Sequence, residues 1–173
     1  TTAVLEWYST ATQLSGILSS VNQSPYPQSV ATDSKGNSFV VGSFRASLFL
    51  VDGQVLNSSG GSDAFIAKFS ANGSVLWVKH LSSSGTDLGV AVEVDKDDNP
   101  VALFQFGNTV TLDSETFSDI QNYPALVVLN VNTNGTVEWY NYVYPAGGTD
   151  SLITPISLST FNRSVTVLAS LIG

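Results

Sequence analysis

The residues best suited to chemistry in this chain form the acidic run Asp95-Lys-Asp97-Asp98-Asn. Oxygen ligands at alternate positions suit Ca²⁺, so Asp95, Asp97 and Asp98 are a weak candidate calcium site. Asp and Asn are also turn residues, because they accept local backbone hydrogen bonds and tolerate left-handed geometry. The matching run Asp33-Ser-Lys-Gly-Asn keeps the turn residues and drops two acids. The comparison favours a turn, and no metal or other cofactor is expected.

Catalysis finds little support in the sequence. His80 is the only histidine, the chain has no Cys, and no nucleophile elbow, P-loop or dinucleotide fingerprint is present. A glycan-cleaving enzyme needs two positioned carboxylates, and no defensible pair stands out. We therefore predict that the protein is not an enzyme.

Aromatic residues offer candidate binding surfaces. Trp7, Trp77 and Trp139 could stack on sugars, but one large aromatic residue per repeat is more often a core element. Tyr140, Tyr142 and a third tyrosine, Tyr144, alternate along one strand, on the face opposite Trp139. They predict an amphipathic patch for a partner, another subunit or a glycan, with at least one of the three in the core.

The charge excludes several classes of partner. The net charge is −8, the pI is about 4.2, and Lys and Arg form no cluster. Nucleic acid and anionic membranes both need a basic face, so neither is an expected partner. The apolar runs are strand-sized, which argues against membrane insertion. The sequence starts without Met, so we expect a processed polypeptide whose signal peptide, if one existed, has been removed.

Five glycosylation sequons predict an extracellular or cell-surface location, with glycans attached covalently. Two of them coincide with Asn-Gly turns, where a glycan points into solvent without disturbing a strand. The acceptor residues are Asn22, Asn57, Asn72, Asn134 and Asn162.

A repeat of 62 residues organises the chain. FIAKFSANGSVLWVKHL, residues 65–81, returns as VVLNVNTNGTVEWYNYV, residues 127–143. Asn-Gly between alternating apolar runs predicts a hairpin with a type I′ turn, in which both central residues have positive φ. The repeat divides one all-β unit into an N-terminal strand and linker (1–28), two full repeats (29–90 and 91–152) and an incomplete third repeat (153–173).

Each repeat predicts short alternating strands and turns, with no sustained helical period. We expect an all-β fold of antiparallel strand repeats, as propeller-like four-stranded blades with the Trp strand last. A single β-sandwich with an internal duplication is the alternative.

The stretch DSKGNSFVVGSF, followed by GGSDAFIAKFSANGSVLWVKHLSSSGTD, resembles the SBBP β-propeller repeat of secreted and cell-surface proteins. The match is good over residues 33–87 and partial over 95–150, where Asp98 stands for Gly, Phe104 for Gly42, and YPALVVLN for SDAFIAK. The resemblance implies four-stranded antiparallel blades and a non-catalytic surface role.

The two ends of the chain are complementary. The segment Ala3, Val4, Leu5, Glu6, Trp7, Tyr8 matches only the last strand of a repeat, and residues after 150 match only the first two strands. We predict that this segment is a donor strand, anchored by Trp7, that pairs beside residues 164–172 of a neighbouring copy and builds a surface filament. The alternative hypothesis is that the chain is a piece of a longer secreted propeller, which binds carbohydrate or mediates Ca²⁺-dependent adhesion.

Overall fold

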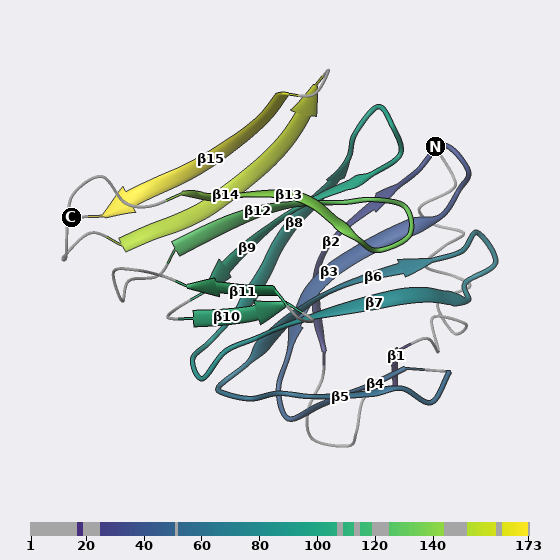
Figure 1. The fold of residues 1–173 in the computed structure, drawn as a ribbon, viewed down its shortest axis with the longest axis horizontal. Helices are drawn as coiled ribbons and strands as arrows, with labels where there is room; N and C mark the ends of the chain where they lie inside the picture. The colour runs from purple at the N-terminus through teal and green to yellow at the C-terminus, as the bar shows by residue number, and fades with distance from the viewer. Residues whose placement is uncertain are drawn as a thin grey trace.

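A computed structural model describes residues 17–18, 25–50, 52–106, 109–112, 115–118, 125–143, 152–161 and 164–172. All regular structure in these ranges is β-strand, and the strands of every sheet pair antiparallel, so the all-β prediction is confirmed. The described residues contain no helix that could cross a membrane. The layers of the fold follow the repeat (Figure 1).

The first repeat forms a meander of four strands, β2 (Tyr26–Thr32), β3 (Ser38–Phe44), β6 (Asp63–Phe69) and β7 (Val75–Ser82), with β7 carrying Trp77 last. Strands β4 (Ser47–Leu50) and β5 (Val55–Asn57) form a hairpin between β3 and β6. With β1 (Ile17–Leu18) this hairpin makes a small sheet. Its Leu48 and Leu50 share a buried cluster with Phe44 and Phe65, so it covers one face of the meander.

The second repeat forms the same meander from β8 (Leu88–Val94), β9 (Pro100–Phe106), β12 (Ala125–Val131) and β13 (Val137–Val143), which carries Trp139. Strands β10 (Thr109–Leu112) and β11 (Glu115–Ser118) form its inserted hairpin. This hairpin pairs with β7 of the first repeat, where Thr111 faces Ser82 and Leu112 faces Leu81. The second repeat thereby extends the sheet of the first to six strands.

The third repeat has two described strands, β14 (Leu152–Phe161) and β15 (Ser164–Ile172), paired as a hairpin. A register shift in each first strand supports the place that the sequence repeat assigns to this hairpin. The shifts fall between Pro27 and Ser29, between Gly89 and Ala91, and between Pro155 and Ser157. Strands β14 and β15 therefore correspond to β2–β3 and to β8–β9.

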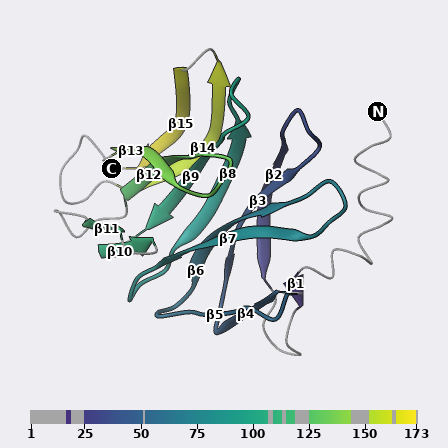
Figure 2. The same cartoon turned by 45° about the vertical axis from the view of Figure 1, so that its right-hand side comes forward.

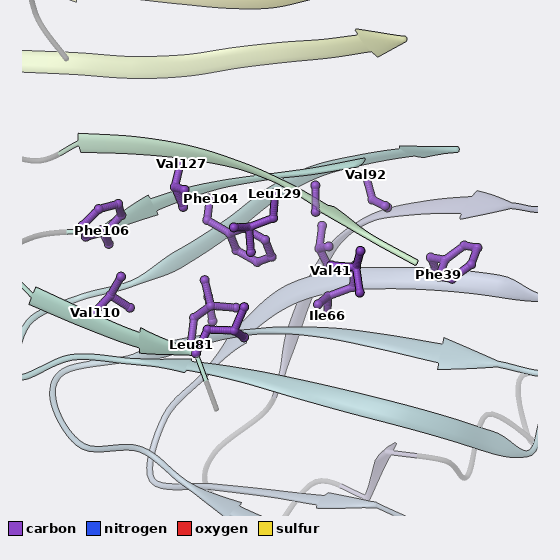
Figure 3. Packing of buried hydrophobic residues seen from close by; sticks show 14 residues of the cluster. Phe39, Val41, Ile66, Leu81, Val92, Phe104, Phe106, Val110, Val127 and Leu129 are labelled. Atoms are coloured by element: carbon purple, nitrogen blue, oxygen red, sulfur yellow. The ribbon is translucent and has the colours of Figure 1, made fainter. Parts of the chain in front are cut away.

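The repeats stack face to face, as the two ribbon views show together (Figure 1 and Figure 2). The main core lies between the first two meanders (Figure 3), where Phe39 and Ile66 of the first share a cluster with Phe104 and Leu129 of the second. On the opposite face of the second meander, Leu103 packs in another cluster with residues of β14 and β15. The second meander is covered on both faces, an arrangement that a two-sheet sandwich does not have.

The turn prediction was wrong in its type. Gly73 donates to the Ser70 carbonyl at 2.8 Å, Ser70 donates to the Ser74 carbonyl at 2.9 Å, and only Gly73 (φ 85°) has positive φ, not Asn72. The β6–β7 register shifts next to this turn. The hairpin is thus a longer loop in which a left-handed glycine forms a bulge, which matches strand twist without requiring positive φ at Asn.

Candidate functional site

The acids of the run 95–99 each have their own partner. One Asp95 carboxylate oxygen accepts the backbone N–H groups of Asp97 and Asn99, both at 2.9 Å, and the other accepts the Asn130 amide at 3.2 Å. Asp97 forms a surface ion pair with Lys96. Asp95 therefore closes its own turn and ties that turn to β12, as Asp and Asn do in ordinary turns.

Asp98 points to the neighbouring repeat. It has φ of 64°, at the turn position that Gly36 (φ 81°) occupies in the first repeat. Its carboxylate accepts the Ser34 backbone N–H at 2.9 Å and the Ser34 hydroxyl at 2.6 Å. The Ser34 hydroxyl and then the Ser34 backbone N–H lower the pKa of Asp98. Among the described residues, no group of three or more His, Cys, Asp or Glu could hold a metal ion.

His80 has an acidic partner that the sequence motifs did not reveal. Its Nε2 lies 2.7 Å from a carboxylate oxygen of the buried Asp63, and its ring contacts Phe44 at 5.2 Å between centroids. In the register, His80 faces Phe65, two residues along β6 from Asp63. That diagonal neighbourhood is the sequence signal that would have found the pair. Among the described contacts of His80, no Ser or Thr hydroxyl lies in a position to serve as a nucleophile.

The two tryptophans in described strands differ in how they are covered. Trp77 is half-buried beneath the turn between β12 and β13, donating from its indole N–H to the Thr133 carbonyl at 3.1 Å. A Cβ added to Gly135 in that turn would lie 3.3 Å from the Trp77 ring. Trp139, at the same position of the second repeat, remains 37 % exposed. In the part of the chain that the structure describes, no third-repeat turn covers it.

Beside Trp139 lies an open cleft of about 500 Å³ between the second and third repeats. It mixes apolar and acidic surface, and Phe161 at its edge is 75 % exposed. Residues of β8, β9, β12 and β13 form one wall, and residues of the β14–β15 hairpin form the other. The lining residues used below are Asp97, Glu138, Trp139 and Phe161.

The predicted tyrosine surface is described only in part. Tyr140 is 42 % exposed and meets Tyr142 edge to face at 5.6 Å. Tyr142 is half-buried, packs against the main core and lies 6.2 Å from Phe106. Tyr144 lies outside the described residues. The patch thus has one exposed and one core-facing member, the division that the sequence analysis anticipated.

Three of the five sequon residues can be placed. Asn57, Asn72 and Asn134 are exposed, the last two in the turns that carry Gly73 and Gly135. Asn22 and Asn162 lie outside the described residues, as does the predicted donor strand, residues 3–8.

No family model and no curated protein matches this chain. The resemblance to the SBBP repeat therefore stays a prediction. Among the described residues, β15 pairs with β14 alone, and the exposed Trp139 lines the cleft beside this hairpin. The sequence analysis did not predict this cleft, because that prediction required knowing that the turn of one repeat covers the tryptophan of the preceding repeat.

Proposed function

We propose that the protein is a non-catalytic structural glycoprotein of the cell surface, which assembles head to tail when its third repeat accepts a strand from a neighbouring copy. The observation that carries the proposal is the open edge of β15. In the first two repeats the second strand has a partner on each side, β2 and β6 for β3, and β8 and β12 for β9. In the described part of the third repeat, β15 pairs with β14 alone.

An edge of this kind recruits strands. In the part of the chain that the structure describes, the outer edge of β15 (Ser164–Ile172) has no strand partner, and the strand sequence SVTVLASLI carries no charge to discourage pairing. Three large apolar side chains on the hairpin are more than half exposed: Ile156, Phe161 and Leu168. Exposed apolar residues grouped beside an open strand edge indicate an interaction surface.

The occupant that we propose is residues 3–8 of a second copy. This segment alternates apolar residues around Trp7 and carries a single charge, Glu6. The sheets correct one detail of the sequence prediction. The strand beside β3 or β9 is the third strand of its repeat, whereas Trp77 and Trp139 lie on the fourth. A strand paired with β15 therefore takes the third position, and Trp7 is there a new anchor rather than a copy of Trp77.

Deletion of residues 1–10 tests the proposal. We expect the intact chain to form polymers in size-exclusion chromatography and electron microscopy, and the truncated chain to stay monomeric with an unchanged melting temperature. A peptide of residues 1–12 should then bind the truncated chain, and a scrambled peptide should not. Polymers that persist after truncation, or an intact chain that stays monomeric, contradict strand donation.

A second candidate is carbohydrate binding in the same cleft. Trp139, Asp97 and Glu138 all line the cleft, and an aromatic ring together with carboxylates can recognise the apolar and hydroxyl faces of a pyranose. Titration of the truncated chain with oligosaccharides distinguishes the two. Oligosaccharide binding that is lost in the Trp139→Ala variant favours the carbohydrate function. If neither the truncated chain nor this variant binds oligosaccharides, strand donation is favoured.

A further inference from the structure

Two buried carboxylates lie at the junction between the first and second repeats, outside the cleft described above. Asp63 begins β6 and is fully buried, and Asp87, just before β8, is 1 % exposed. Each has one oxygen with no hydrogen-bond partner, Oδ1 of Asp63 and Oδ2 of Asp87. A buried ionised oxygen without a donor is strongly unfavourable, so each of these oxygens needs a partner: a shared proton, a cation or an ordered water.

The backbone holds the two acids together. Asp87 donates its N–H at 2.7 Å to the carbonyl of Ser62, the residue next to Asp63, and the Ser62 hydroxyl donates to the Asp87 carbonyl at 3.3 Å. Nearby, Gly61 donates to the Gly85 carbonyl at 2.7 Å. A Cβ on Gly60 would lie 2.5 Å from the Gly85 oxygen. The loops 58–62 and 83–87 are therefore packed backbone against backbone.

The remaining oxygens are already used. Asp63 Oδ2 accepts the Ser59 N–H at 2.9 Å and faces His80 Nε2 at 2.7 Å, and Asp87 Oδ1 accepts the Ser83 hydroxyl at 2.8 Å. Burial is the largest cause that raises the pKa of Asp87 to about 7, and the charge of Asp63 raises it further. Among the described groups, Asp63 is the charge that acts on Asp87, and His80 meets Asp63 on its other oxygen.

We propose that Asp63 and Asp87 share one proton, and that its loss to solvent at higher pH loosens the junction of the loops 58–62 and 83–87. The Oδ2–H of protonated Asp87 donates to Oδ1 of Asp63, so a single proton satisfies both unpartnered oxygens. When it leaves, each of the two buried carboxylates keeps an oxygen without a donor, and the two charges repel. In the second repeat Ala125 and Tyr142 replace Asp63 and His80, so this pH-sensitive joint belongs to the first repeat alone.

The test is the melting temperature of the intact chain against pH, compared with two isosteric variants. A proton held in the folded state at a raised pKa stabilises fully below the ordinary pKa of 3.8, and its contribution is lost as the pH rises through the raised pKa of about 7. We expect a fall of about 5 °C between pH 5 and pH 7.5 in the wild type. His80→Gln keeps a donor for Asp63 and should keep the fall. Asp87→Asn supplies a permanent N–H donor and should lose it.

Three results overturn the proposal. The first is a fall that survives Asp87→Asn and disappears in His80→Gln, because the histidine would then be the titrating group. The second is a melting temperature that CaCl₂ raises at pH 8 in the wild type but not in Asp87→Asn, because the pair would then hold a metal. The third result does not depend on a folded variant. It is a wild-type NMR titration in which the carboxyl ¹³C shifts show that Asp63 and Asp87 both titrate below pH 5.

Discussion

Gly89→Ala tests the stacking of the first two repeats more directly than any core truncation. Gly89 lies in β8, and a Cβ built on it meets the N and O atoms of Gly42 in β3, both at 2.6 Å. Ordinary van der Waals contact begins at 3.4 Å, so the two backbones must separate by about 0.8 Å (3.4 − 2.6). Neither partner can move alone, because each backbone is held within its own sheet.

The expected sign is opposite to that of an ordinary Gly→Ala change. In an extended strand without crowding, alanine stabilises by about 0.4–1 kcal/mol, because it restricts the unfolded chain. Overpacking at a fixed backbone contact costs about 1–3 kcal/mol, and separating the two sheets here falls at the high end. We therefore expect a net loss of about 2 kcal/mol, or a fall in melting temperature of roughly 4–8 °C for a chain of this length.

The assay is urea unfolding followed by tryptophan fluorescence, with Gly53→Ala as the matched control. Gly53 has open space around its missing Cβ but φ of 87°, so the control loses about 1 kcal/mol through backbone strain alone. A Gly89→Ala protein as stable as the wild type, or more stable, would refute the backbone contact and with it the stacking of β3 on β8.

The remaining predictions concern single groups. Trp77→Phe should cost about 1–2 kcal/mol in urea unfolding, because it removes an indole donor and ring contacts, whereas Trp139→Phe should cost less than about half as much; equal losses would contradict the uncovered state of Trp139. Protein from its native source should exceed the bare 18.3 kDa through glycans at Asn72 and Asn134, and an intact mass equal to the polypeptide would refute this. Because the acids of residues 95–98 have separate partners, EDTA should leave the thermal midpoint unchanged; a fall would restore the calcium reading.

Much of the fold was available from the 62-residue spacing. Residues at equal offsets form equal strands, so Lys68 and Asn130 occupy matching places on β6 and β12 and contact Asp33 and Asp95 respectively. The type of the turn could not be predicted from the Asn-Gly dipeptide alone. A type I′ turn and the glycine bulge both favour this dipeptide, and the one-residue difference lies in the register of the strands around Gly73.

The site was harder to predict because its features are contacts between repeats. Asp98 stands where the first repeat has glycine, and the sequence presents this only as a departure from a pattern. In the structure its positive φ carries a carboxylate to Ser34 of the preceding repeat. Strain at a non-glycine residue is compensated by bonds that a glycine could not make. The periodicity within a repeat identifies the strands. A residue that breaks the pattern, such as Asp98, contacts a residue of another repeat, and that contact is visible only in the structure.

The stack has two unlike ends, and this difference bears on how copies could associate. At one end the β1–β4–β5 sheet covers the first meander, burying Leu48 and Leu50 against Phe44 and Phe65. At the other end lies the β14–β15 hairpin (Figure 1), in which β15 has no second strand partner among the described residues. Stacking of copies sheet on sheet is therefore disfavoured, because it would have to displace the covering sheet.

The covered end is also where the proposed donor segment is tethered. Ile17 pairs with Leu50 in the covering sheet, so residues 3–8 are joined to the end of the stack away from β15. The eight residues 9–16 span at most about 29 Å when fully extended. A strand tethered at one end and accepted at the other joins different surfaces of two copies, and such a heterologous contact repeats along a filament unless its rotation closes a ring. Shortening the linker by four residues should therefore weaken polymerisation without changing the melting temperature of the monomer. Unchanged polymers would place the donor elsewhere in the chain.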